Sequence, residues 1–309
     1  MTRFVLAALL TVASVAEPAA QPRTTVFVGS TPCGEGIRTV LTIPREADAE
    51  LIEWELTLVD PADTRGAATY HLRYRFGPTR PNQPGLDATA TSLERRGTWR
   101  VAANARRQPT AGVVALDNGL SLLKVSDTIL HALAPDGSLM VGNGGWSYTL
   151  SRRDAVEKDV DTRLVAADTG DPDRTTSRAT GPTVFGIFDG RTPCQGIARD
   201  LGVAARPGCW KAKWRLTLLH DPKTRQPTTY RLEGTLYGSR PREGSWRIVR
   251  GAPALPDADV YVLGPVNGES PALLLKGDDR VLFFLDRNRR PLTGNARNAY
   301  TLDRIPSSR

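Results

Sequence analysis

The stretch Trp54-Glu55-Leu56-Thr57-Leu58 returns later in the chain as Trp214-Arg215-Leu216-Thr217-Leu218. In both copies apolar side chains alternate with polar ones, which is typical of a β-strand with one face buried and one face in water. Residues 70–76, Tyr-His-Leu-Arg-Tyr-Arg-Phe, alternate in the same way. The sequence therefore indicates a repeated unit built of half-buried strands.

The repeat extends over most of the chain. Several landmarks return in the same order: Thr31-Pro32-Cys33 as Thr192-Pro193-Cys194, residues 97–101 as 244–248, Gly142-Asn143 as Gly294-Asn295, and Tyr148-Thr149-Leu150 as Tyr300-Thr301-Leu302. Ordered self-similarity of this length indicates duplication of one structural unit. We expect two domains, 23–150 and 183–309, which is a normal domain size.

The composition favours strands and turns over helices. The 309 residues include 23 prolines and 28 glycines, and the apolar residues fall in short runs. Residues 281–285, Val-Leu-Phe-Phe-Leu, predict a central strand, and Asp136-Gly137 predicts a hairpin turn. Closing six to eight such strands on themselves removes exposed edges. We therefore predict an all-β fold of two small antiparallel barrels, lipocalin-like or OB-like.

Two segments fall outside the repeat. Residues 151–182 are rich in charge and lack aromatic side chains, so they bury too little apolar surface to order themselves, and we expect a flexible linker. Residues 1–22 read as a signal peptide and leader, with Arg3, an apolar run from 4 to 12 and Ser14-Val15-Ala16. The run is too short to span a bilayer, which takes about 20 residues. We expect a soluble bacterial protein without a membrane span, periplasmic or secreted.

Charge is spread unevenly over the two repeats. Residues 24–150 carry 12 basic and 13 acidic side chains, whereas residues 183–309 carry 21 and 12. A basic face is able to meet an anionic surface, but the sequence contains no nucleic-acid motif, and we expect no nucleic-acid partner. The densest basic cluster, Arg287-Asn288-Arg289-Arg290, falls where we expect a turn, and a solvated surface is its simplest interpretation.

The three cysteines predict one disulfide and one unpaired thiol, because cysteines of exported proteins form disulfides in an oxidising compartment. Cys194 and Cys209 lie in the same repeat, and Ala49 stands at the position equivalent to Cys209 in the first repeat. We therefore predict a Cys194–Cys209 disulfide. Cys33 is left over, as a buried thiol or, alternatively, as a residue for intermolecular pairing or redox chemistry.

We predict no catalytic residue. The histidines, His71, His131 and His220, do not fall in a metal-binding spacing, and His220 is expected in a turn. The sequence has no nucleophile elbow, phosphate loop or Gly-rich dinucleotide turn. Five tryptophans mostly recur at equivalent positions in the two repeats, which favours core packing over a ligand platform; the five are Trp54, Trp99, Trp146, Trp214 and Trp246.

The order of these landmarks resembles the N-terminal domain of the NlpE family of envelope lipoproteins. Both repeats show an entry strand ending in Thr-Pro-Cys, then Gly-Ile, a Leu-Thr-Leu strand, a Tyr-x-Leu strand, a Gly-x-Trp motif and a late apolar strand before an Asp-Gly-type turn. The resemblance implies a small β-barrel in the bacterial envelope, in a family linked to copper tolerance, adhesion sensing and envelope stress.

The sequence lacks two cysteines that are typical of this family, the second thiol of a Cys-x-x-Cys pair and the cysteine that carries the lipid anchor. Family members carry a Cys-x-x-Cys pair that suits a soft metal. Here the matching stretches are Cys33-Gly34-Glu35-Gly36 and Cys194-Gln195-Gly196-Ile197, so the second thiol is missing from both. Cys33 and Cys194 stay as weak candidate ligands for copper, and we predict no cofactor. The first cysteine, Cys33, also lies too far from the apolar run to carry a lipid anchor.

These observations predict a non-catalytic envelope protein that binds a protein partner or a small ligand in envelope stress or copper tolerance. The alternative is a lipocalin-like carrier of a small apolar ligand, which requires an open cavity of roughly several hundred Å³ inside a barrel. An enzyme whose site no motif reveals is the third possibility.

Overall fold

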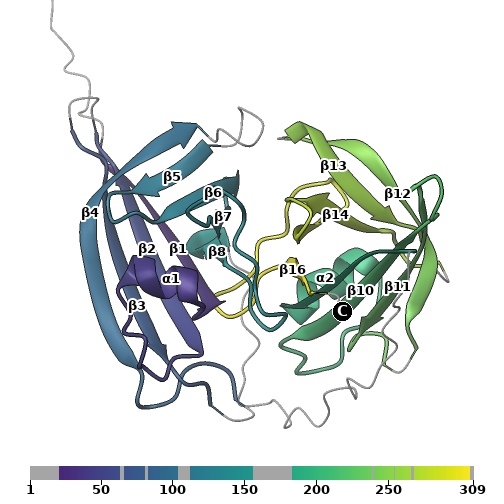
Figure 1. Ribbon diagram of the computed structural model, residues 1–309, viewed down its shortest axis with the longest axis horizontal. Coiled ribbons are helices and arrows are strands. Elements are labelled where there is room, and N and C mark those ends of the chain that lie inside the picture. Colours follow the sequence, from purple (N-terminus) through teal and green to yellow (C-terminus); the bar gives the residue numbers. More distant parts are fainter. Residues whose placement is uncertain are drawn as a thin grey trace, which may run out of the picture.

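The computed structural model describes residues 21–62, 66–80, 83–103, 112–155, 183–238, 240–253, 255–265 and 268–306. Of the expected signal peptide and leader, 1–22, residues 1–20 lie outside these residues. Of the expected linker, 151–182, residues 156–182 lie outside them, whereas residues 151–155 are described and form the end of a strand and a short 3₁₀ helix (Arg153–Ala155). Within them, the chain forms two closed antiparallel barrels of eight strands each (Figure 1).

Both barrels connect their strands in chain order. The first contains β1 (Arg23–Pro32), β2 (Leu51–Asp60), β3 (Thr69–Gly77), β4 (Thr91–Ala103), β5 (Gly112–Leu116), β6 (Ser121–Ser126), β7 (Ile129–Ala132) and β8 (Thr149–Arg152). The second contains β9 (Val184–Thr192), β10 (Ala212–His220), β11 (Pro227–Gly234), β12 (Arg242–Ala252), β13 (Leu255–Leu263), β14 (Ala272–Lys276), β15 (Val281–Leu285) and β16 (Thr301–Arg304). The predicted fold class is confirmed, and this strand order is that of an up-and-down barrel rather than a five-stranded OB-fold.

A hydrogen bond repeated in both barrels explains two of the sequence landmarks. Trp54 Nε1 donates to Thr31 Oγ1 at 2.8 Å, and Trp214 Nε1 donates to Thr192 Oγ1 at 2.9 Å. A buried indole N–H needs an acceptor, and the Thr of each Thr-Pro-Cys landmark supplies one. The bond ties the first strand of each barrel to the second from inside.

Each barrel closes where its first strand meets its last, as β1 pairs with β8 and β9 pairs with β16. The backbones approach closely at Gly29, where a Cβ would lie 2.7 Å from Leu150 Cδ2 and 2.9 Å from the carbonyl oxygen of Thr149. Only a residue without a side chain fits there, and Gly190 occupies the equivalent position in the second barrel.

One short helix follows the first strand of each barrel and packs into its core. Helix α1 (Glu35–Leu41) buries Ile37 and Leu41, and helix α2 (Cys194–Leu201) buries Ile197 and Leu201. A continuous cluster of apolar side chains occupies the interior of each barrel. Side chains therefore fill the space that a lipocalin-like carrier would keep open for its ligand.

A third apolar cluster joins the two barrels. Strand β15 sends Leu282 and Phe284 into its own barrel, and it sends Val281, Phe283 and Leu285 towards the first barrel. The prediction of a central strand at 281–285 is therefore confirmed. Both sides of this strand are apolar because one side faces the core of its own barrel and the other side packs against the first barrel. The residues of the first barrel in this cluster are Val113, Leu123, Val125, Ile129, Leu133 and Leu139.

The contact between the barrels follows the internal repeat. In Figure 1, β6 and β7 of the first barrel and β14 of the second lie on facing sides. Thr149 and its equivalent Thr301 place their hydroxyl oxygens 3.0 Å apart. His131 meets its equivalent Phe283 edge to face, with ring centroids 5.4 Å apart. Equivalent residues touch one another in this way across a two-fold axis, so the barrels are related by a local pseudo-two-fold.

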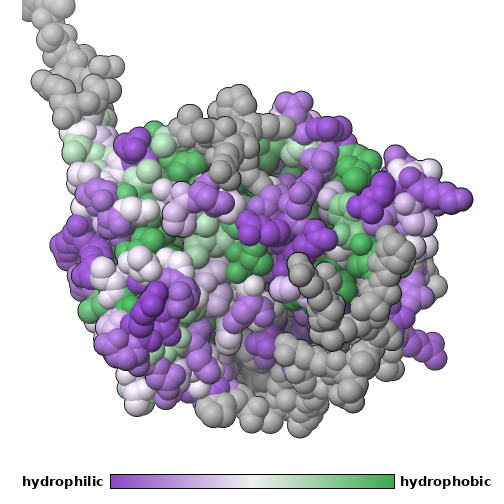
Figure 2. Space-filling model, viewed as in Figure 1, coloured by the Kyte–Doolittle hydropathy of each residue, from purple (hydrophilic) through white to green (hydrophobic). Residues whose placement is uncertain are grey.

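Apolar surface is correspondingly scarce on the outside of the molecule. Figure 2 shows hydrophilic residues over much of the visible face, with separate patches of hydrophobic residues between them. Among the described residues, the exposed large hydrophobic side chains are Val101 and Ile248, which are themselves equivalent in the repeat. The apolar outer faces of β5–β7 and β13–β15 cover each other instead.

Candidate functional site: the groove between the barrels

A groove of about 740 Å³ runs along the junction of the two barrels. The first barrel contributes the β6–β7 turn around Asp127, and the second contributes the start of β13 and the segment that follows β15. Its apolar lining includes Val125, Leu255, Leu275, Pro291 and Leu292. Neither barrel alone forms this groove, because residues of both barrels line it.

The groove carries an excess of basic side chains, namely Lys124, Arg199, Arg289 and Arg290, against Asp127 and Asp286. Asp127 is already paired with Lys124 at 2.7 Å. The Asp286 carboxylate accepts the backbone N–H groups of Asn288 and Arg290, each at 2.8 Å. None of the three arginines forms an ion pair within the described residues, so the groove is electropositive.

The turn that carries two of these arginines is held by its own backbone. Asp286 N donates to the Arg290 carbonyl at 2.8 Å, and Arg289 N donates to the Asp286 carbonyl at 2.9 Å. Arg289 has a left-handed backbone with φ of 59°, and its Nη1 donates to the Gly251 carbonyl at 3.1 Å. The expected turn is confirmed, but Arg289 and Arg290 line the groove rather than a featureless surface.

A shallower pocket of about 520 Å³ lies beside Cys33, lined also by Ala49, Trp146 and Tyr148. The thiol is unpaired and buried, as the simplest interpretation of the sequence expected. Burial raises the pKa of Cys33, an effect that nearby Arg38 partly offsets. The reactive thiolate form is therefore disfavoured at neutral pH.

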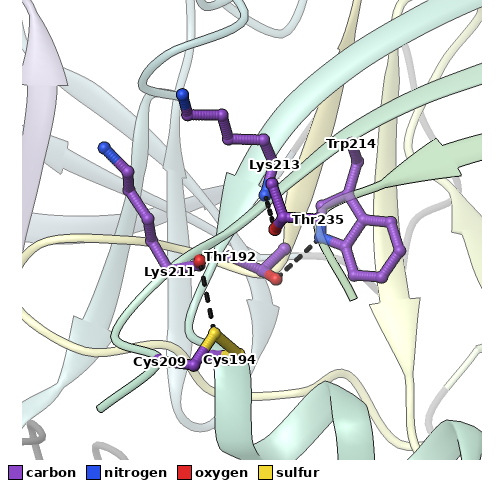
Figure 3. Close-up of a disulfide and its surroundings, with 7 residues drawn as sticks. All are labelled: Thr192, Cys194, Cys209, Lys211, Lys213, Trp214 and Thr235. Atoms are coloured by element: carbon purple, nitrogen blue, oxygen red, sulfur yellow. Dashed lines mark hydrogen bonds between the residues drawn. A yellow bond between two sulfur atoms is a disulfide. The ribbon is translucent and has the colours of Figure 1, made fainter. Parts of the chain in front are cut away.

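The predicted disulfide between Cys194 and Cys209 is present, with Cα atoms 5.8 Å apart. It ties the first residue of α2 to the loop before β10, next to the Trp214–Thr192 hydrogen bond (Figure 3). Cys194 consequently has no free thiolate for a metal. No group of three or more His, Cys, Asp or Glu side chains gathers as a metal site in the part of the chain that the structure describes. The two candidate ligands, Cys33 and Cys194, therefore do not offer copper a pair of free thiolates.

The three histidines lie apart and serve structural contacts. His71 bonds Glu94 at 2.7 Å on the outer face of β3. His131 is fully buried at the junction of the barrels, between Thr149 and the Met140 carbonyl. The expected turn position of His220 is wrong, because its backbone N–H bonds the Thr183 carbonyl and extends β10 to this residue.

The tryptophans mostly pack as predicted. Trp54, Trp214 and Trp246 are buried in the barrel cores, and Trp99 packs against the first core while partly exposed. Trp146 differs, because it lies under the guanidinium of Arg191 from the other barrel, 5.5 Å from the ring centroid. It therefore belongs to the junction of the barrels.

A buried carboxylate also lies at this junction. Asp303, on β16, is 1% exposed and accepts the backbone N–H of Gly142 from the first barrel at 2.7 Å. Burial raises the pKa of Asp303 to about 7, and the neighbouring Asp278 charge adds to the rise. The repeat places Ser151 at the equivalent position, so this carboxylate is particular to the second barrel.

No protein-family model, curated protein or solved structure matches this chain. Among the described residues, no helix combines the length and the apolar character needed to cross a membrane. The groove was not apparent from the sequence, since its lining comes from turns and strand ends of both repeats. The one available signal was the run of apolar residues on the outward side of β6, β7 and β15.

Proposed function

We propose that this protein is a non-catalytic binding protein of the bacterial envelope, in which two NlpE-like barrels act as one body and bind a ligand or partner in the groove between them. The groove itself carries the proposal, because it combines apolar lining with unpaired basic side chains and depends on both barrels. The disulfide supports an oxidising compartment outside the cytoplasm.

A role in envelope stress or copper tolerance is part of this proposal and is supported by the order of the NlpE-like landmarks. Bound copper is not part of it, because Cys194 is oxidised and Cys33 is a single buried thiol. The lipocalin-like carrier is less well supported, because apolar side chains fill both barrels.

The test is an NMR fragment screen on the isotope-labelled protein, with chemical-shift changes mapped onto the sequence. We expect hits to shift the backbone amides of Leu255, Leu275 and Thr293 in the groove. Leu255→Asp, which places a charge in the apolar lining, should abolish these shifts. Hits that shift Leu56 or Leu216 inside the barrels would support the carrier, and a screen without groove hits would contradict the proposal.

A further inference from the structure

The internal repeat supplies a comparison for the basic turn of the groove. In the first barrel, Ala134 N donates to the Ser138 carbonyl and Gly137 N donates to the Ala134 carbonyl, both at 2.8 Å. These bonds repeat those of the turn 286–290. Gly137 and Arg289 therefore occupy the same position in two turns of the same hydrogen-bonding pattern.

The two residues differ in the conformational energy that a left-handed backbone costs them. Gly137 has φ of 79° and Arg289 has φ of 59°, so both are left-handed. Glycine adopts this conformation without penalty, whereas an arginine Cβ crowds the backbone. A strained residue at a cleft points to a role for its side chain, because the fold of the turn does not require it.

Three of the four basic side chains of the groove are likewise specific to the second repeat. Arg199, Arg289 and Arg290 correspond to Thr39, Gly137 and Ser138 of the first repeat. The turn pattern and the helix are therefore compatible with neutral residues at all three positions. Arg289 uses one N–H on the Gly251 carbonyl, which aims the guanidinium while its other donors remain unassigned.

We infer that the groove binds a small organic anion with an apolar body, such as a medium-chain carboxylate, with Arg289 and Arg290 on the anionic group. The inference rests on the proposed function and names the class of its ligand. Guanidinium groups recognise carboxylates through charge-assisted hydrogen bonds, and the leucine lining suits an aliphatic chain. A volume of about 740 Å³ is that of a site for one such molecule rather than a protein surface.

The experiment compares a dansyl-labelled undecanoate with its methyl ester by fluorescence titration of the whole protein. The two probes share the apolar body and differ in the charge. We expect the carboxylate to bind more tightly than the ester, and Arg289→Gly or Arg290→Gln to weaken it about tenfold or more, as expected for loss of a hydrogen bond to a charged group. Both variants should weaken the ester much less than the carboxylate, because the neutral ester makes no charge-assisted hydrogen bond.

Two further variants separate the possible failures. Arg96→Gln removes one positive charge from an exposed position on β4 and should leave carboxylate binding unchanged. Leu255→Asp should weaken both probes. If the two probes bind equally, if neither binds, or if the arginine variants bind the carboxylate normally, the inference is wrong. If Leu255→Asp leaves both probes bound as before, the groove is not the binding site and the proposed function fails with it.

Discussion

Arg38 Nη2 donates a 2.7 Å hydrogen bond to the carbonyl oxygen of Ala49, the residue that stands where the second barrel has Cys209. Arg38 Nε also bonds the Cys33 carbonyl at 3.1 Å. One guanidinium thus joins, by hydrogen bonds, the two segments that a disulfide joins in the other barrel. The equivalent of Arg38 in the second barrel is Ala198, which has no such reach.

Replacing Arg38 should destabilise the first barrel. Arg38→Ala removes hydrogen bonds to carbonyl groups on both sides of the loop after α1, including those of Pro44 and Ala47. We expect a loss of about 2 kcal/mol in the free energy of unfolding, allowing for partial exposure. Urea denaturation measures it. Arg45→Ala, which breaks only an exposed ion pair with Glu35, is the control and should change little.

A second disulfide should form on introducing Ala49→Cys. Cys33 and position 49 are equivalent to Cys194 and Cys209, whose sequence separation is 15. Closing a loop of about this length stabilises by about 3 kcal/mol on the chain-entropy model. Thiol titration of the unfolded variant should find no free thiol, and thermal unfolding should shift upward unless reductant is present. Two titratable thiols would show that the first barrel cannot adopt the geometry of the second.

Neighbouring phenylalanines on β15 should separate docking of the barrels from their folding. Phe283→Ala opens a cavity at the junction, whereas Phe284→Ala opens one inside the second barrel. We expect each to cost about 3–5 kcal/mol. Hydrogen exchange distinguishes them, since Phe283→Ala should expose the facing strands of both barrels and Phe284→Ala should loosen the second barrel only. Identical exchange patterns would argue against a separable junction.

Stability should depend on pH through Asp303. Burial raises the pKa of this carboxyl from 3.8 to about 7, so the folded protein holds the proton more tightly than the unfolded chain. The contribution of Asp303 to the free energy of unfolding is therefore largest in acid, and it falls as the pH rises from 3.8 to about 7. The full shift corresponds to about 4 kcal/mol.

Asp303→Asn checks this directly, because an amide does not titrate. The stability difference between the variant and the parent protein should grow from pH 4 to pH 7, in favour of the variant, and level off above it. A difference that stays constant over this range would show that the carboxyl titrates normally in the folded protein.

The strain at Arg289 predicts a gain in stability on its removal. Arg289→Gly should raise the free energy of unfolding by about 1 kcal/mol, because glycine relieves the left-handed backbone. The reciprocal change, Gly137→Arg, should lower it by a similar amount in the matching turn of the first barrel. Thermal unfolding of the two variants measures both. Changes of the same sign in the two variants would refute the backbone explanation.

The sequence was sufficient for the barrels but not for their junction. The alternation at Trp54, Leu56 and Leu58 identifies the side chains that point inward, because every second residue of a strand faces the barrel interior. Outward apolar residues such as Leu123 and Phe283 indicated a second buried face but not what covers it, since their partners lie in the other repeat. The disulfide followed from the cysteine count and the repeat. The groove did not follow, because its residues meet only after the two barrels pack.

The pseudo-two-fold through Thr149 and Thr301 relates two residues of one chain, so a substitution alters only one of the two equivalent positions. In a homodimer of a single barrel, every substitution would appear twice, and the grooves on both sides of the junction would remain identical. Joining the halves in one chain removes that constraint. An arginine stands at 289 and a glycine at 137, so the positive charge of this turn is present on one side of the pseudo-two-fold and absent from the other.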